Sequence, residues 1–367
     1  MPVTKFRTQN LLLLITTTTL ESFSCSSYTL NPIIRSAMST DIHSISSDIP
    51  RRMLTICIGA PIVFLLLSDG TSSKIFLTIV HFLCGIEWIT ALVPRRIQKQ
   101  VLQEYRLKFV LRAWLVLSVA ISVFIMKDEK FIGNAIIRFS CLNVSSRLLG
   151  RFGNIDSKSM DAYQHALDGF LFITTGFSSL LFISVSAGFM HALFFALVVW
   201  NGDTGALIAG RLGKFLHLKY PSKFPSDLVS LVVPSFITKI VLKVSPKKTM
   251  TGFLGGLLFS VITAFYLPFL LNAVFHLLCE DQATFYCQEE VESRQIKLLQ
   301  ELMPGDLIET GLLLSLTGIC GDLFESTIKR SAHQKDSGKL LPGHGGLMDR
   351  MDSMLFAASI YVLYVIT

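Results

Sequence analysis

The chain has 367 residues, of which 51% are hydrophobic and only 16% are charged. Because soluble proteins carry about 25% charged residues, this composition argues against a soluble globular protein. The formal net charge is +7, yet the basic residues are not interleaved with aromatic ones, so we expect no nucleic acid as a partner. Basic pairs beside apolar runs, such as Arg51-Arg52 and Arg95-Arg96, instead indicate loops on one side of a membrane.

Residues 1–50 differ from the rest of the chain. Ser and Thr are abundant there, and up to residue 40 the only acid is Glu21, against three basic side chains. A short apolar stretch, Leu11–Ile15, follows the basic start. This composition predicts an N-terminal targeting segment, with a disordered tail as the alternative. It leaves the destination open between an organellar membrane, plastid or mitochondrial, and the endoplasmic reticulum.

Apolar runs recur along the remaining chain, and a helix needs roughly 20 residues to cross a bilayer. The longer runs are Ile75–Val93, Val110–Met126, Phe170–Ala187 and Phe253–Leu278, and the shorter ones are Leu54–Ser68, Gly188–Trp200, Leu307–Cys320 and Ser353–Thr367. We therefore predict an all-α polytopic integral membrane protein with about eight transmembrane helices. Residues 51–160 would hold the N-terminal helices, and residues 161–367 a catalytic transmembrane domain.

Two charged motifs adjoin these apolar runs. In Asn201–Lys214, Asp203 lies eight residues before Arg211, about two helical turns, so both can share one face of a helix. The alternative is a charge pair at a helix end. In Ser245–Gly256, two lysines precede glycines that open an apolar helix, a pattern that favours phosphate binding. The alternative there is a basic membrane anchor followed by glycines for helix packing.

The third motif, residues 322–352, is the most densely charged part of the chain. Asp322 ends an apolar run, and the 27 residues from Ser326 to Asp352 combine cations, acids and a Gly-flanked His344. Charge beside a membrane span is expensive unless it has a function. Lysine and arginine suit phosphate oxygens, and aspartate suits a hard cation, so the motif predicts a metal–polyphosphate site. A purely structural ion network is the alternative.

This third motif resembles the signature of phosphatidate cytidylyltransferases, also called CDP-diacylglycerol synthases. The matching residues are Ser326, Lys329-Arg330, Lys335-Asp336, Pro342–Gly346 and Asp349-Arg350-Met351-Asp352. The first two motifs are similar to other segments of the same family, in the same order. The pattern departs from the family at Met250 and Thr251, where an aromatic residue and a glutamate are usual.

The resemblance implies the reaction of CTP with phosphatidate, taken from the bilayer, to give CDP-diacylglycerol and pyrophosphate. It implies an active site at polar helix ends, with loops on the cytosolic or stromal side. It also implies a Mg²⁺ ion, a second cation such as K⁺, and a homodimer. A phosphate monoester is already a competent nucleophile, so positioning and charge neutralisation should provide most of the catalysis.

We assign site residues on this basis. The expected catalytic residues are Asp322, Asp349, Lys329 and Arg330, and the two aspartates are also the expected Mg²⁺ ligands, with Ser326 and Asp352 supporting the metal. The expected substrate-binding residues are Lys247, Lys248, Arg350, Ser326, Lys335, Asp336, His344 and Asp203.

Two other functions are compatible with a charged, polytopic chain. One is a different CTP-dependent membrane enzyme, such as a polyprenol or phytol kinase, which would release CDP instead of pyrophosphate. The other is a transporter with Glu87 and His81 as pathway groups. Their six-residue spacing does not place both on one helix face, which disfavours a transporter. Glu87 is better explained as a group that lines a polar cavity or pairs within the bundle.

Overall fold

The structure is a computed structural model in which part of the chain is described. The described residues are 61–94, 97, 113, 116–121, 157–219, 244–245, 248–279, 304–338, 340 and 345–366. All of them belong to one compact unit, Thr55–Thr367, and the other unit is Met1–Leu54. The expected targeting segment, residues 1–50, therefore lies outside the described residues, as does most of the region between residues 95 and 156.

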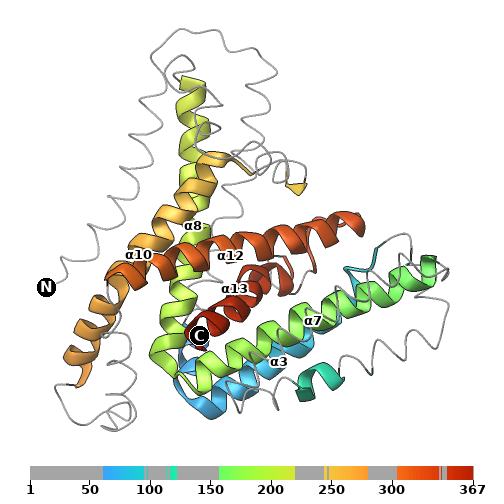
Figure 1. Cartoon of the computed structure of the whole chain (residues 1–367), viewed down its shortest axis with the longest axis horizontal. Helices are drawn as coiled ribbons and strands as arrows, with labels where there is room; N and C mark the ends of the chain where they lie inside the picture. The colour runs from blue at the N-terminus through green and yellow to red at the C-terminus, as the bar shows by residue number, and fades with distance from the viewer. Residues whose placement is uncertain are drawn as a thin grey trace, which may run out of the picture. The chain divides into compact units, whose positions relative to one another are not determined.

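Six long α-helices make up the described bundle (Figure 1). They are α3 (Gly70–Thr90), α7 (Ser157–Val185), α8 (Phe189–Lys219), α10 (Met250–Cys279), α12 (Pro304–Ser331) and α13 (Met348–Ile366). Figure 1 shows α3 running along α7, and α13 beside α12, and both pairs are in contact. The charged third motif thus occupies the end of α12, the start of α13 and the segment that joins them.

Five of these helices are long and apolar enough to cross a membrane. The candidate spans are Gly70–Thr90, Gln164–Val185, Phe189–Lys214, Met250–Leu271 and Gly305–Ser331. The described part is that of an all-α polytopic integral membrane protein, as the composition predicts. The expected total of about eight spans is not confirmed. The expected spans Leu54–Ser68 and Val110–Met126 lie partly or largely outside the described residues.

Two helices are longer than the apolar runs that predict them. The short run Gly188–Trp200 continues as α8 to Lys219, because no proline lies between Trp200 and Lys219 to stop the helix. The run Leu307–Cys320 continues as α12 to Ser331, through Asp322 and Lys329. The first charged motif therefore lies within α8, whereas the third begins within α12 and continues past its end.

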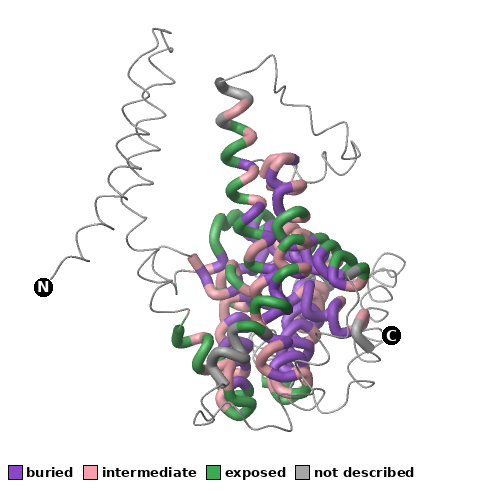
Figure 2. The backbone as a smooth tube through the Cα atoms, turned by 90° about the vertical axis from the view of Figure 1, so that its left-hand side faces the viewer, coloured by how far each residue is buried: buried purple, intermediate pink, exposed green. Residues whose placement is uncertain are grey.

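The interior of the bundle is apolar and aromatic. Buried residues line the facing sides of the helices in Figure 2. Trp88 of α3 is fully buried and stacks on His165 of α7, with ring centroids 5.1 Å apart, and on Phe324 of α12, at 6.4 Å. Its indole N–H donates to the His165 carbonyl oxygen at 3.2 Å. One aromatic side chain therefore joins three helices next to the charged part of α12.

Helices α8 and α10 pack with almost no space between their backbones. A Cβ atom added to Gly255 would lie 2.2 Å from Ala209 Cβ and 2.8 Å from the Gly205 carbonyl oxygen. A Cβ added to Gly252 would lie 2.7 Å from the carbonyl oxygen of Ala206. Small residues permit such close packing between membrane helices. The glycines after the two lysines thus have a packing role, as the alternative interpretation of that motif requires.

Large apolar side chains remain exposed on the outer face of α10. Tyr266, Phe269 and Leu270 are each about 60% exposed, and Leu258 is 58% exposed. A contiguous apolar face of this kind is unusual on a soluble monomer, and it is expected where a helix contacts the hydrocarbon of a bilayer. The outer face of α10 therefore agrees with its assignment as a membrane span.

We expect Gly255→Ala to destabilise the fold, because the added methyl group meets backbone atoms of α8 that cannot turn aside. Overpacking of this kind costs about 1–3 kcal/mol. The measurement is the thermal unfolding midpoint of the purified protein in detergent micelles. Gly305→Ala is the matched control, since its Cβ would meet no heavy atom within 4 Å. Equal midpoints for both variants would contradict the close contact of α8 and α10.

Candidate functional site

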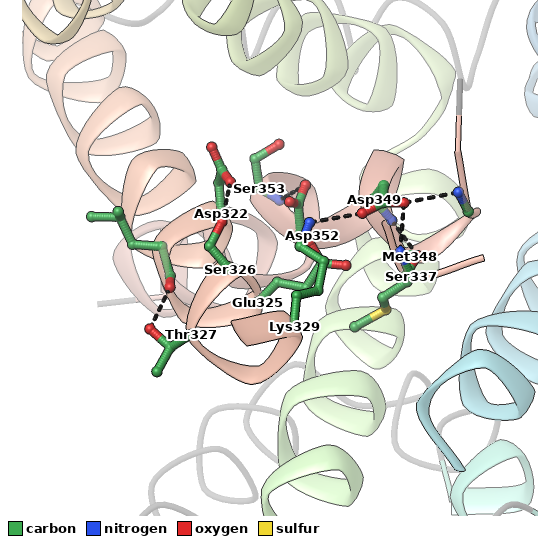
Figure 3. A network of polar contacts seen from close by, with 12 residues as sticks. Asp322, Glu325, Ser326, Thr327, Lys329, Ser337, Met348, Asp349, Asp352 and Ser353 are labelled. Carbon is green, nitrogen blue, oxygen red and sulfur yellow. Dashed lines mark hydrogen bonds and ion pairs between the residues drawn. The ribbon is translucent and has the colours of Figure 1, made fainter. Parts of the chain in front are cut away.

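The polar side chains of α12 form one row directed at the start of α13. Asp322, Glu325, Ser326 and Lys329 follow one another at intervals of three, one and three residues. Residues three and four apart are neighbours on a helix surface, so these four share a face. Figure 3 shows this row and the facing residues Asp349, Asp352 and Ser353 of α13. Glu325 and Ser326 are buried, although the row lies at the end of a candidate membrane span.

Lys329 connects the two helices. Its Nζ atom lies 2.5 Å from Glu325 Oε2, one turn earlier on α12, and 2.7 Å from Asp349 Oδ1 on α13. The lysine is 9% exposed, and the Glu325 side chain is fully buried. Buried charges are tolerated when they are paired and hydrogen-bonded, and Lys329 provides that partner to Glu325 Oε2 and to Asp349 Oδ1, whereas the buried Glu325 Oε1 has no hydrogen-bond partner among the described residues. The ion pairs thus fix the end of α12 against the start of α13.

Asp349 is held on its other side by the backbone. Its Oδ2 atom accepts hydrogen bonds from the N–H groups of Ser337 and Gly346, both at 2.8 Å. Gly345 has a positive φ of 86°, a conformation that glycine adopts readily, and it brings the chain back toward α13. Burial raises the pKa of Asp349, but the hydrogen bonds and charge of Lys329, together with the backbone donors, outweigh it, and the net pKa is lowered.

Asp322 pairs with the second motif. Lys248, just before α10, forms a short ion pair with Asp322 Oδ2, and Ser326 Oγ donates to Asp322 Oδ1 at 3.2 Å. Both partners of this ion pair remain 31% exposed. The pair is therefore accessible, in contrast to the buried Lys329 cluster.

The first motif joins the site through α13. Ser353 Oγ donates to Asp203 Oδ2 of α8 at 3.2 Å. The neighbouring Asp352 is buried, and its Oδ1 accepts the backbone N–H of Ser353 at 2.7 Å. Burial raises the pKa of Asp352 well above its usual value, and the negative charges of Glu325 and Asp322 raise it further. Residues from all three motifs thus meet around the end of α12.

The expected metal ligands face different cations in this arrangement. Asp322 is paired with Lys248, while Asp349 is occupied by Lys329 and two backbone N–H groups. Oxygen donors suit Mg²⁺, but in the described part of the chain no three acidic, His or Cys side chains gather closely enough to hold a metal ion. As arranged here, the residues do not fit an enclosed magnesium ion, so the metal assignment stays a prediction.

Of the other expected site residues, some are exposed near the site and two lie outside the described residues. Arg330, Lys335, Asp336 and Arg350 are exposed around the end of α12 and the start of α13. Lys247 and His344 lie outside the described residues. The roles assigned to all of these residues stay predictions, because position alone does not test them.

Four polar residues at the site were not among the expected site residues: Ser353, Glu325, Ser337 and Glu87. Glu325 could have been found from sequence, since it precedes Lys329 by one helical turn. Ser337 and Glu87 carry no such local signal: Ser337 Oγ donates to Glu87 Oε2 at 2.9 Å, across 250 residues of chain. Glu87 does pair within the bundle, as its place in an apolar run suggests.

The C-terminal part of the chain is similar to known nucleotidyltransferases. The sequence model of the cytidylyltransferase family matches residues 237–367. Over 172 residues the chain is 37% identical to a phosphatidate cytidylyltransferase of Staphylococcus haemolyticus, covering 47% of each protein. Over 176 residues it is 32% identical to a phosphatidate cytidylyltransferase of Staphylococcus aureus, again covering 47% of each.

A further relative is an uncharacterised Escherichia coli protein, YnbB. It is 37% identical over 127 residues, which are 35% of this chain and 33% of that protein. The chain thus spans about half, or less, of the length of these curated relatives. The comparisons confirm the resemblance to the cytidylyltransferase family over residues 237–367, the part that contains Lys248, Asp322, Lys329 and Asp349.

Proposed function

We propose that this protein is a phosphatidate cytidylyltransferase, which converts CTP and phosphatidate into CDP-diacylglycerol and pyrophosphate. The observation that carries the proposal is the meeting of three charged motifs around the end of α12, two of which lie in the part that matches the cytidylyltransferase family. The relatives named as phosphatidate cytidylyltransferases support this substrate pair over a polyprenol kinase or a transporter.

In this reaction a phosphate oxygen of the lipid attacks the α-phosphorus of CTP. A new P–O bond forms there, the bond from the α-phosphorus to the bridging oxygen breaks, and pyrophosphate leaves with the electron pair. Both reactants are anions, so the protein must mainly align them and offset their repulsion. No covalent enzyme intermediate is needed, because the lipid phosphate is itself the nucleophile.

The exposed cations are the candidates for contact with these anions. Arg330, Lys335 and Arg350 are exposed, and Lys248 is partly exposed beside Asp322. Arginine binds phosphate oxygens in a bidentate manner, and lysine acts as a point charge. We assign these four side chains to the triphosphate and the lipid phosphate.

Lys329 has a different role in this proposal. It is buried between Glu325 and Asp349, so its charge is already paired within the protein. We assign it to positioning, in that it holds Asp349 and the start of α13, and not to direct contact with substrate. In this proposal Asp322 orients the partly exposed Lys248.

Several features of the proposal come from the family resemblance. Mg²⁺, with a second cation such as K⁺, would supply positive charge beside the phosphates, and no step above is routed through either ion. A homodimer and an N-terminal targeting segment to an organellar or endoplasmic reticulum membrane are further expectations. The lipid substrate requires a membrane location, which agrees with the candidate spans.

We expect Asp322→Asn to lower the rate of CDP-diacylglycerol formation by at least about 100-fold, as removal of one strong electrostatic group does in other enzymes. The neutral side chain no longer pairs with Lys248, so the lysine loses its orientation. The measurement uses membranes that contain the full chain, labelled CTP, phosphatidate and Mg²⁺, with the lipid and pyrophosphate products quantified separately.

Glu309→Gln is the matched control, because it removes an exposed acid from the same helix. It should retain the activity of the unmodified chain. Formation of a phosphorylated alcohol and CDP would instead identify a CTP-dependent kinase. Equal activity of the Asp322→Asn and Glu309→Gln variants would remove Asp322 from the site.

We expect Lys329→Met to destabilise the protein by about 3–5 kcal/mol, because it leaves Glu325 and Asp349 without their shared cation in a buried place. The measurement is the free energy of unfolding in detergent. Arg330→Met, at the exposed neighbouring position, is the control and should change stability by less than about 1 kcal/mol. Similar losses for both variants would show that the buried ion pairs do not stabilise the fold.

A further inference from the structure

Glu87 occupies the last turn of α3, at a place where its own helix disfavours a carboxyl group. The carboxyl end of a helix carries partial negative charge, which repels an acidic side chain. The residue is also part of a candidate membrane span, where acids are rare unless they have a partner. A reason for an acid at this position must therefore come from outside α3.

The partners of Glu87 come from the segment that leads into α13. Its Oε1 atom accepts the backbone N–H of Leu347 at 2.9 Å, and its Oε2 atom accepts the N–H of Met348 at 2.8 Å. Ser337 Oγ donates a third hydrogen bond to Oε2 at 2.9 Å. The first N–H groups of a helix have no partner within that helix, and α13 begins at Met348. Glu87 therefore caps α13 from a different helix.

Ser337, which binds Glu87, also forms hydrogen bonds with Asp349. The N–H of Asp349 donates to Ser337 Oγ at 3.2 Å, and the Ser337 N–H donates back to Asp349 Oδ2 at 2.8 Å. Ser337 thus links the carboxyl group of Glu87 to the residue that binds Lys329. The chain of contacts runs from α3 through this turn to α12.

The turn is packed tightly around Glu87. A Cβ atom added to Gly338 would lie 2.5 Å from Glu87 Oε1, and one added to Gly346 would lie 2.7 Å from Glu87 Oε2. The adjacent residue in α3, Trp88, is fully buried and stacked against α7 and α12. Glu87 is therefore presented from a fixed point of the bundle to a turn that leaves no room for another side chain.

We propose that Glu87 is a positioning residue that holds Ser337 and the residues from Gly346 to Asp349 in register with α12, and thereby sets the place of Asp349. It touches no reacting atom. Its effect on catalysis rests on the proposed function, but its effect on the turn does not.

The first test measures hydrogen exchange of the full chain in detergent micelles. Glu87→Gln removes the charge but keeps the shape, and loss of a hydrogen bond to a charged group should speed exchange at Leu347 and Met348 by about 10-fold or more. Exchange in α8 should stay unchanged. Unchanged exchange at the turn, or an equal rise throughout the bundle, would overturn the proposal. Glu309→Gln is the control, an exposed acid on α12 that should leave exchange at the turn as it is.

The second test is a double-variant cycle with Ser337→Ala, read as exchange at the Asp349 amide and as kcat and KM for CTP. If Glu87 acts through Ser337, the two substitutions together should change exchange and kcat by less than the product of their separate effects. The expected loss lies mainly in kcat, since no substrate contact is removed. If the double variant instead shows the full product of the two separate effects, the two residues act independently and the proposal is overturned. If the unmodified chain forms no CDP-diacylglycerol, the proposed function fails, and the exchange cycle still decides the role of Glu87.

Discussion

The contact of Lys329 with Glu325 and Asp349 is the interaction on which the arrangement of the site depends. Two carboxyl groups from different helices approach one nearly buried ammonium group, at 2.5 and 2.7 Å. Without the cation, the two carboxylates would repel each other in an apolar bundle. Either α12 and α13 would separate, or one of the carboxyl groups would take up a proton. With it, the end of one helix is fixed to the start of the next, although residues 332–347 lie between them in sequence.

Close packing of α8 against α10 provides the second constraint. The glycines at their crossing let Asp203, on α8, and Lys248, just before α10, approach the same part of α12 and α13. The three motifs are far apart in sequence, and none of them is a site alone. Helix packing therefore has a functional consequence here, because it brings together charged side chains that lie on three separate motifs.

The sequence predicted the parts of this arrangement that depend on local pattern. The apolar runs predicted the helices, but the pair of Glu325 and Lys329, one turn apart on α12, was not among the predictions although their spacing allows it. The apolar runs stop at Trp200 and Cys320, whereas α8 continues to Lys219 and α12 to Ser331, so hydropathy alone does not give the length of these helices. The partnership of Glu87 with the turn before α13 was beyond prediction, since no spacing rule relates residues 260 positions apart.

The charge balance around α12 explains why additional positive charge is needed for the proposed reaction. Near the end of α12, the described acids Asp203, Asp322, Glu325, Asp349 and Asp352 face two lysines, Lys248 and Lys329. A triphosphate and a lipid phosphate would add more negative charge, and repulsion at short range is strong where water is excluded. The exposed side chains of Arg330, Lys335 and Arg350 offset part of this negative charge. The remaining deficit is the physical reason to keep a divalent cation in the proposal, although the acids as arranged do not enclose one.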